Sequence, residues 1–326
     1  MIPSAPYTGV FPIAPTPFTD TGDLDLPGMR RVLDCMVDQG VDGICILANY
    51  SEQFLLNDEE RDTLLDLCLT HVAGRVPVIV TCSHFSTRIA AARAKRAAGA
   101  GAQMLMLMPP YHGASLRADE KGIVEHFAAV AAAAVPESGT PLPLMVQDAP
   151  LSGVTLPVSL LMRLAREIPQ VCYFKIEVPN AAAKLRGLIE AGRSAEAAAG
   201  RSAADGPLIA GPFDGEESIT LMADLAAGAT GTMPSALLPD LIGSVVNSYL
   251  AGMREEAAAL YARILPLINF ENRQCGLRAC KTVMMEGGVI KSDAVRHPLE
   301  ALHPATRAGL LELAREADPI ALRWGK

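Results

Sequence analysis

The segment Met104-Leu105-Met106-Leu107-Met108 is apolar at every position, so it has no polar face to turn towards water. A strand of an antiparallel sheet commonly alternates between apolar and polar residues, whereas a strand of a parallel sheet is covered on both faces. The segment therefore predicts a strand in a parallel sheet that helices cover on both sides.

Seven other short apolar segments precede and follow this one, and helical stretches separate them. The eight predicted strands are Val10–Phe18, Gly43–Ala48, Val76–Cys82, Gln103–Met108, Leu142–Gln147, Val171–Glu177, Pro207–Gly211 and Ala229–Met233. Eight strands in alternation with helices favour an α/β protein whose parallel sheet closes into a (β/α)8 TIM barrel. A doubly wound open sheet is the alternative that this alternation leaves open.

The segments between the strands have the apolar periodicity or the alanine content of helices. They are Leu26–Gln39, Asp58–Val72, Thr87–Ala98, Ala118–Ala134, Pro157–Glu167, Ala181–Ala191 and Glu217–Ala227. Asn57 is placed to cap the second of them, and residues 192–206 are predicted to be a long loop.

Beyond residue 238 the pattern predicts helices alone, at Leu241–Ala251, Glu255–Ile268, Leu277–Met285 and Pro304–Ala317. A (β/α)8 barrel takes about 250 residues. We therefore expect a catalytic barrel over residues 1–238 and a C-terminal helical extension over residues 239–326.

The composition carries no sign of a nucleic-acid or membrane partner. The chain has 28 basic and 36 acidic residues and a net charge of -8, without a long Lys/Arg run. No apolar run approaches the roughly 20 residues of a membrane span, and no signal-peptide pattern opens the sequence, so a cytoplasmic protein is expected. The seven cysteines include no Cys-x-x-Cys pair, which favours reduced, buried thiols over disulfides or zinc ligands. No metal or other cofactor is expected.

Lys175 is the most informative residue, because it lies within the apolar segment Val171–Ile176. Desolvation disfavours the ammonium form and leaves an amine that can attack a ketone to form an imine. A lysine at a strand end that reaches solvent is the other interpretation. The remaining six lysines are expected at surface or helix positions. Glu177 shares a strand face with Lys175, either as an acid/base group or simply as its ion-pair partner.

Further candidates follow other strands, at the end of a barrel where active sites lie. Asn49, Tyr50 and Ser51 are expected to hold a substrate carboxylate, and His84 and His112 to contact substrate. Tyr111 is a candidate for proton transfer, although it and His112 also suit an ordinary surface loop.

The loop Gly211–Glu216 is predicted to follow the seventh strand and to contact the distal end of the substrate through Phe213, Asp214 and Glu216. Carboxylates there, including Glu217, would accept hydrogen bonds from hydroxyl groups and repel a second carboxylate. The alternative is that these acids merely begin a helix.

Three of these segments together resemble the dihydrodipicolinate synthase / N-acetylneuraminate lyase family. They are Gly-x-x-x-Leu-Ala-Asn-Tyr-Ser-Glu (43–52), Pro-Pro-Tyr-His (109–112) and Tyr-Phe-Lys-Ile (173–176), and the resemblance extends from Gly9 into the C-terminal tail. It implies a homotetrameric enzyme that forms a Schiff base between Lys175 and a 2-keto acid and needs no metal.

The sequence departs from the family pattern at two places. The family's hydroxyl-rich carboxylate loop maps onto Ala48–Glu52, where Asn49 and Tyr50 replace the two hydroxyl residues. Its catalytic tyrosine maps onto Gln147, in Gln147-Asp148-Ala149-Pro150. A glutamine amide does not titrate, so Gln147 is predicted to be a main reason for elimination of water in place of carbon–carbon cleavage.

Four longer motifs resemble one subfamily, the bacterial L-2-keto-3-deoxyarabonate dehydratases: residues 46–56, 145–150, 211–217 and 269–274. This resemblance implies a lyase of L-arabinose metabolism that dehydrates L-2-keto-3-deoxyarabonate to α-ketoglutaric semialdehyde. A class I retro-aldolase on a related 2-keto-3-deoxy sugar acid is the alternative. A non-catalytic keto-acid sensor is a third possibility, against which the retained Lys175 argues.

Overall fold

The computed structural model describes residues 6–112, 116–201 and 206–326. These residues form two compact units. Unit 1 holds the N-terminal residues up to Thr8, Ile79–Glu216 and Thr220–Thr232, and unit 2 holds Gly9–Val78, Glu217–Ile219 and Met233–Lys326.

Unit 1 is built on parallel strands that follow one another in chain order. The strands are β3 (Val78–Thr81), β4 (Met104–Leu107), β7 (Leu144–Asp148), β8 (Val171–Ile176), β9 (Gly211–Asp214) and β10 (Gly231–Thr232). Each pairs in parallel with the next. All residues of β4, β7 and β8 are buried, which confirms the prediction from residues 104–108 that both faces of these strands are covered.

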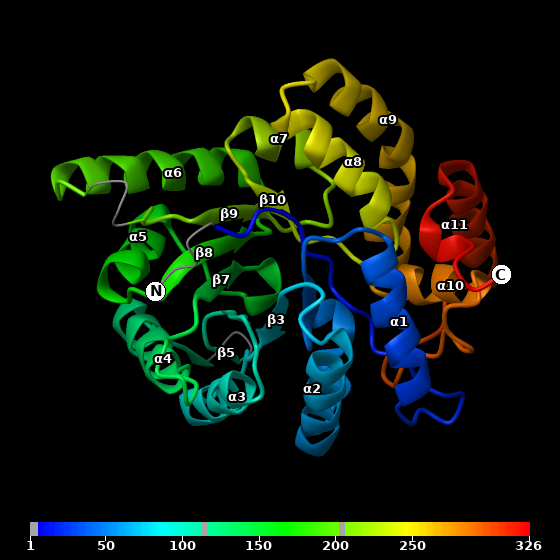
Figure 1. The fold of residues 1–326 in the computed structure, drawn as a ribbon, viewed down its shortest axis with the longest axis horizontal. Helices are drawn as coiled ribbons and strands as arrows, with labels where there is room; N and C mark the ends of the chain where they lie inside the picture. Colours follow the sequence, from blue (N-terminus) through cyan, green and yellow to red (C-terminus); the bar gives the residue numbers. More distant parts are fainter. Residues whose placement is uncertain (1–5, 113–115, 202–205) are drawn as a thin grey trace. The chain divides into compact units, whose positions relative to one another are not determined.

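Helices follow the strands of unit 1 and lie beside them (Figure 1). They are α3 (Thr87–Gly99), α4 (Glu120–Ala133), α5 (Val158–Glu167), α6 (Ala181–Ala198) and α7 (Leu221–Ala226). Neighbours in this series pack together, and α5 and α6 also contact β8. After β4, the short strands β5 (Tyr111–His112) and β6 (Leu116–Arg117) pair antiparallel.

Unit 2 begins with β1 (Gly9–Val10) and β2 (Ile44–Ile46), which are followed by α1 (Leu26–Asp38) and α2 (Asp58–Val72) respectively. The N-terminus of α2 carries the predicted cap. The side chain of Asn57 accepts a hydrogen bond from the Glu60 N–H, and the Glu60 carboxylate accepts one from the Asn57 N–H. Ile13 forms parallel bridges both to Cys45 of β2 and to Ser235, just after the last strand of the chain. Within unit 2, the segment around Ile13 is therefore bridged on one side to the second strand and on the other to Ser235.

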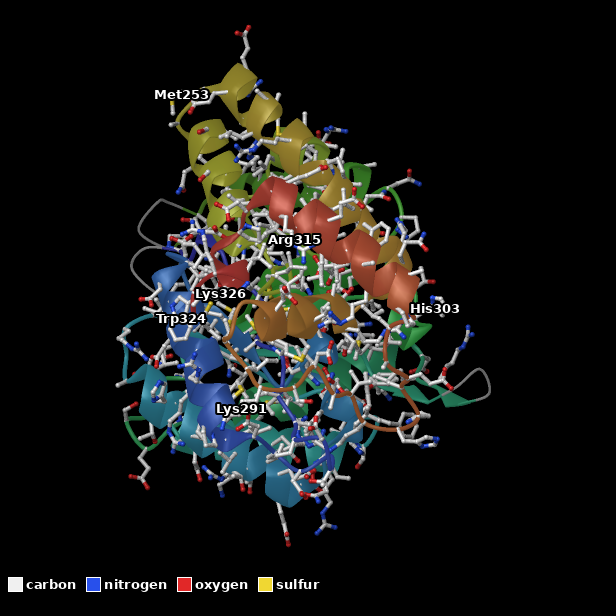
Figure 2. All side chains as sticks on the ribbon, turned by 90° about the vertical axis from the view of Figure 1, so that its right-hand side faces the viewer. Met253, Lys291, His303, Arg315, Trp324 and Lys326 are labelled. Carbon is white, nitrogen blue, oxygen red and sulfur yellow. The ribbon has the colours of Figure 1, made fainter. Side chains whose placement is uncertain are left out.

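The C-terminal part of unit 2 is helical. It contains α8 (Pro239–Leu250), α9 (Arg254–Phe270), the π-helical turn η5 (Glu271–Cys275), α10 (Arg278–Glu286) and α11 (Pro304–Ala317). Figure 2 shows α11 with Arg315 near its end and Trp324 near α1, where the Trp324 indole donates to Asp38 Oδ2 at 2.7 Å. The helices predicted beyond residue 238 are confirmed.

The sequential strand order and the two bridges of Ile13 confirm the (β/α)8 fold over the doubly wound alternative, in which the strand order reverses at a switch point. All seven cysteines are buried and free. Within the ranges given above, no helix has both the length and the apolar character needed to cross a membrane.

Some predicted bounds are wrong. The first strand spans only Gly9–Val10, because prolines interrupt residues 12–17. The seventh strand lies at Gly211–Asp214 and not at Pro207–Gly211. The predicted loop at 192–206 is helical up to Ala198, where α6 ends, and residues 202–205 lie outside the described residues. The helix predicted from Glu217 begins at Leu221, because Glu217 and Ser218 have left-handed φ angles of 45° and 66°.

Candidate active site

Lys175 lies in the middle of unit 1, on β8 between β7 and β9. Its register partners are Gln147 on β7 and Phe213 on β9, and the residue is only 3% exposed. A buried ammonium group is costly unless an acceptor compensates for its lost hydration. The predicted position of Lys175 in a buried strand is confirmed, so the solvent-reaching interpretation is wrong.

Glu177 supplies that acceptor, one residue beyond the end of β8. Its Oε1 atom forms an ion pair with Lys175 Nζ, and the side chains are 4% and 14% exposed respectively. The same Oε1 accepts a hydrogen bond of 2.9 Å from Gln147 Nε2. Gln147 Oε1 is buried, and among the described residues it has no hydrogen-bond partner. One carboxylate oxygen therefore joins the amine to the amide, and a carboxylate so placed can exchange a proton with the amine.

Gly215 packs directly against Lys175 and Glu177. A Cβ atom at this position would lie 2.4 Å from Glu177 Cγ and 2.8 Å from Lys175 Cγ. Both distances are far below a van der Waals contact, so a side chain would displace the pair. Gly215 also donates its N–H to the Ile176 carbonyl at 3.1 Å, which holds the backbone close to the end of β8.

The predicted carboxylate-binding residues lie in unit 2, where Asn49–Ser51 form the 3-10 turn η1. Ser51 Oγ donates to the Ala14 carbonyl at 2.7 Å, and the Ser51 carbonyl accepts from Thr16 Oγ1 at 2.7 Å. The Asn49 side-chain oxygen accepts from Gln53 Nε2 at 2.7 Å. Since a serine hydroxyl has one proton to donate and that of Ser51 is donated to Ala14, this side chain fixes the turn.

Glu52 follows this turn and forms a second buried lysine–glutamate pair. It adopts a left-handed backbone conformation (φ 58°), and its carboxylate pairs with Lys281 of α10. Lys281 also donates to the Ala294 carbonyl at 2.7 Å, and its Nζ lies 4.4 Å from the centroid of the Phe18 ring. Burial lowers the pKa of Lys281, although the charge of Glu52 opposes this effect. The expected helix position of Lys281 is confirmed, and the structure adds that this lysine is fully buried.

The remaining polar candidates of unit 1 lie on separate segments. His84 Nδ1 accepts the Ser86 N–H at 2.9 Å, and Tyr111 begins the short strand β5 with a half-buried side chain. The side chain of His112 lies outside the described residues. His126 of α4, to which the sequence assigned no role, is buried with Nδ1 3.0 Å from Thr87 Oγ1. Burial, with a smaller contribution from His84, lowers the pKa of His126 to about 4, so its ring is neutral near pH 7.

The predicted loop at Gly211–Glu216 is wrong for Phe213 and Asp214, which lie inside β9 and are fully buried. Asp214 accepts a hydrogen bond from the Thr232 hydroxyl. Burial, with the nearby charge of Asp224, raises the pKa of Asp214 to about 7. The Asp214 carboxyl is therefore fully buried and bonded to Thr232, and it is not available to a substrate. The sequence missed this because Gly211-Pro212 is typical of a turn.

Glu216 and Glu217 do follow the strand. In unit 2, Asn272 Nδ2 lies within 3.3 Å of Glu217 Oε2, and the Tyr261 hydroxyl contacts the carbonyls of Ser218 and Ile219 at 3.0 and 2.6 Å. Glu217 and Asn272 belong to two of the four longer motifs, and their contact lies within unit 2. The left-handed segment 217–218 is thus held by side chains of the C-terminal helices.

Comparison with known proteins agrees with this geometry. The model of the Dihydrodipicolinate synthetase family matches residues 6–317. The chain belongs to this family. It is 52% identical over 318 residues to L-2-keto-3-deoxyarabonate dehydratase of Azospirillum brasilense, across 98% of this chain and 97% of that protein.

More distant family members share the fold. The chain is 30% identical to 4-hydroxy-tetrahydrodipicolinate synthase of Xanthomonas axonopodis pv. citri, over 97% of this chain and 95% of that protein. The crystal structure of dihydrodipicolinate synthase from Rhodopseudomonas palustris superposes with a TM-score of 0.83 at 26% identity, over 97% of this chain and all of that one. The predicted family and fold class are confirmed. Nowhere in the described ranges do three His, Cys, Asp or Glu side chains gather as a metal ion would require.

Proposed function

We propose that the protein is a lyase that dehydrates L-2-keto-3-deoxyarabonate to α-ketoglutaric semialdehyde through a Schiff base on Lys175. The observation that carries the proposal is the buried cluster of Lys175, Glu177 and Gln147. Support for the substrate comes from the relative with 52% identity. Its name is that of a dehydratase of this acid, and the chain covers 97% of its length.

The reaction begins at Lys175. Glu177 takes a proton from the lysine ammonium group, because its Oε1 already contacts Nζ. The neutral amine then attacks C2 of the keto acid. Glu177 returns its proton to the departing oxygen, so that loss of water gives the iminium and leaves Glu177 ionised. Asn49 and Tyr50 bind the substrate carboxylate in this proposal, as the family resemblance implies.

The iminium draws electrons from C3 and acidifies its hydrogen atoms. Glu177 is the proposed base that takes a C3 proton and forms the enamine. The enamine then expels the C4 hydroxyl, which leaves as water with a proton from an acid, and Glu177 is placed to return the one that it took. Loss of a C5 proton, protonation at C3 and ketonisation of the resulting enol give the aldehyde, and hydrolysis frees Lys175.

Gln147 favours elimination over cleavage. Retro-aldol cleavage of C3–C4 needs a base for the proton of the C4 hydroxyl, and an amide cannot act as one. Gln147 instead donates its N–H to Glu177, which keeps this carboxylate beside the amine. The same iminium thus leads to loss of water.

Other residues contribute to binding in this proposal. Glu216 accepts hydrogen bonds from the C5 hydroxyl and repels a second carboxylate, which favours a five-carbon acid over a six-carbon diacid. Tyr111, His84 and His112 are proposed to assist proton transfer or binding. We further propose a cytoplasmic homotetramer in L-arabinose metabolism, with residues 239–326 as a helical extension of a 1–238 barrel.

Product analysis tests this function. Purified protein is incubated with L-2-keto-3-deoxyarabonate, and the products are separated and identified by mass spectrometry. We expect α-ketoglutaric semialdehyde from the wild-type protein and no product from Lys175→Ala. Pyruvate with glycolaldehyde would identify a retro-aldolase, and the absence of any product would favour a sensor; either result contradicts the proposal.

A further inference from the structure

Unit 1 contains another lysine–carboxylate pair, immediately behind the Lys175 cluster. Asp148 is the last residue of β7, and its carboxylate pairs with Lys184 of α6. The side chain of Asp148 is 1% exposed and that of Lys184 is 15% exposed. Because side chains alternate along a strand, Asp148 lies on the opposite face of β7 from Gln147.

The two pairs are connected through Glu177. The N–H of Glu177 donates to the backbone carbonyl of Asp148 at 3.0 Å, while the carboxylate of Glu177 accepts from Gln147 Nε2 at 2.9 Å. Two consecutive residues of β7 therefore hold the backbone and the side chain of Glu177. Since Glu177 lies one residue past the end of β8, its position depends on the end of β7.

Lys184 is the ion-pair partner of the buried Asp148 carboxylate. Burial raises the pKa of Asp148, the hydrogen bond and charge of Lys184 oppose the rise, and the charge of Glu177 adds to it. Apart from the ion pair with Lys184, neither carboxylate oxygen of Asp148 has a hydrogen-bond partner among the described residues. Lys184 is thus the group that both neutralises this buried charge and ties β7 to α6.

We propose that Lys184 and Asp148 are positioning residues for Glu177. Their ion pair fixes the end of β7, and the Asp148 carbonyl and the Gln147 amide then hold the carboxylate beside Lys175 Nζ. This inference rests on the proposed function, in which Glu177 moves the protons. Misplacement of a reacting group by about 1 Å can cost about 100-fold in rate.

The test compares Lys184→Met with the double variant Asp148→Asn/Lys184→Met. Lys184→Met leaves a buried, unpaired carboxylate, so both the melting temperature and kcat are expected to fall, kcat by about 10- to 100-fold. The double variant has no buried charge at this place, so its melting temperature recovers. Its kcat stays low, because the tie between β7 and α6 is still missing.

The matched control is Arg163→Met, which removes the cation of an exposed ion pair with Glu167 on α5. It should leave kcat and stability within about twofold and a few degrees of the wild type. Lys184→Arg keeps a cation and should restore most of kcat. Throughout the series KM should change less than kcat, and borohydride trapping of pyruvate on Lys175 should persist.

Two results would overturn the inference: kcat that recovers together with stability in the double variant, or kcat of Lys184→Met near that of Arg163→Met. If Lys184→Met does not fold, the double variant and Lys184→Arg decide between these outcomes. Failure of the proposed function is separate, because it would appear in the wild-type protein as the absence of a Lys175 adduct or of the semialdehyde.

Discussion

Two buried lysine–glutamate pairs, one in each unit, look alike in charge and differ in their surroundings. In unit 2, Lys281 contacts Glu52, the Ala294 carbonyl and the Phe18 ring, and Glu52 is 1% exposed. The second carboxylate oxygen of Glu52, Oε2, lies 3.4 Å from the backbone nitrogen of Arg296. In unit 1, Glu177 shares one oxygen between Lys175 and Gln147, and its side chain is 14% exposed.

Both lysines are buried beside a carboxylate, so these two features alone do not predict which lysine reacts. Lys281 and Glu52 are both enclosed, with side chains 0% and 1% exposed, so a substrate would have to displace their contacts with one another. The partner of Lys175, Glu177, is 14% exposed, so this is the less enclosed of the two pairs. We therefore expect Lys175 to form the imine with substrate and Lys281 to stabilise the fold.

The largest expected effect is on turnover. Lys175→Ala should lower kcat by at least about 10⁴-fold, because the proposed imine forms on this residue and loss of a covalent nucleophile costs at least this much. Steady-state assay of the dehydration, with circular dichroism as a check of folding, measures it. A folded variant that retains a hundredth of wild-type activity would remove Lys175 from the chemistry.

The second prediction concerns Lys281→Met, which leaves Glu52 buried without its cation. We expect the free energy of unfolding to fall by about 3–5 kcal/mol, the usual cost of breaking one side of a buried pair. The double variant Lys281→Met/Glu52→Gln should recover much of the loss. Denaturant titration measures both, with Lys121→Met as the control, because Lys121 forms an exposed pair with Glu125. Losses of equal size in Lys281→Met and the control would show that this pair is not a structural anchor.

In unit 2, the buried carboxyl group of Glu271 accepts a hydrogen bond of 2.6 Å from the Ser235 hydroxyl. Burial raises the pKa of Glu271 to about 7. Between the unfolded value, near 4.5, and about 7, the native state keeps a proton that the unfolded state has lost. Stability from this group therefore falls as the pH rises through that range.

Glu271→Gln is neutral at every pH, so it should remove this dependence. We expect the variant to lose about 2–3 kcal/mol less stability than the wild type between pH 5 and pH 8. Thermal or denaturant unfolding at the two pH values measures the difference. Parallel pH profiles for the two proteins would mean that Glu271 is ionised in the fold.

The smallest expected effect is on the choice of reaction. Gln147→Tyr places a phenol where the amide now donates to Glu177, and a phenol can serve as a base for the C4 hydroxyl. We expect the ratio of cleavage to dehydration to rise by about tenfold, or about 1.4 kcal/mol between the two transition states. Pyruvate and semialdehyde are quantified from the same reaction. An unchanged ratio in a variant that still traps pyruvate on Lys175 would refute the role given to Gln147.

Local pattern was enough to predict most of the fold. A uniformly apolar segment identified β4, a largely apolar one identified β8, and Asn57 as a cap marked the start of α2 at the correct residue. The seventh strand was misplaced because Gly211 and Pro212 are typical of turns. In the structure Gly211 is required there, since a Cβ would lie 2.3 Å from the Tyr173 ring. The continuation of α6 was missed although Ala, Arg and Glu are good helix formers.

The site was predictable only where it depends on neighbours along one strand. The two-residue spacing of Lys175 and Glu177 predicted their pairing, which is confirmed. The contact of Gln147 with Glu177 depends on the register between β7 and β8, and the pairing of Lys281 with Glu52 joins residues 229 positions apart. Such contacts arise from tertiary packing, to which a single sequence gives no direct access.

The most direct test of the account is to identify which lysine carries the substrate. The wild-type protein is treated with pyruvate and sodium borohydride, digested, and mapped by mass spectrometry. If substrate binds covalently through Lys175, we expect one reduced pyruvate adduct, on the peptide that contains Lys175. Lys184 and Lys281 should be unmodified. An adduct on Lys281 or on any lysine other than Lys175, or no adduct at all, would contradict this expectation.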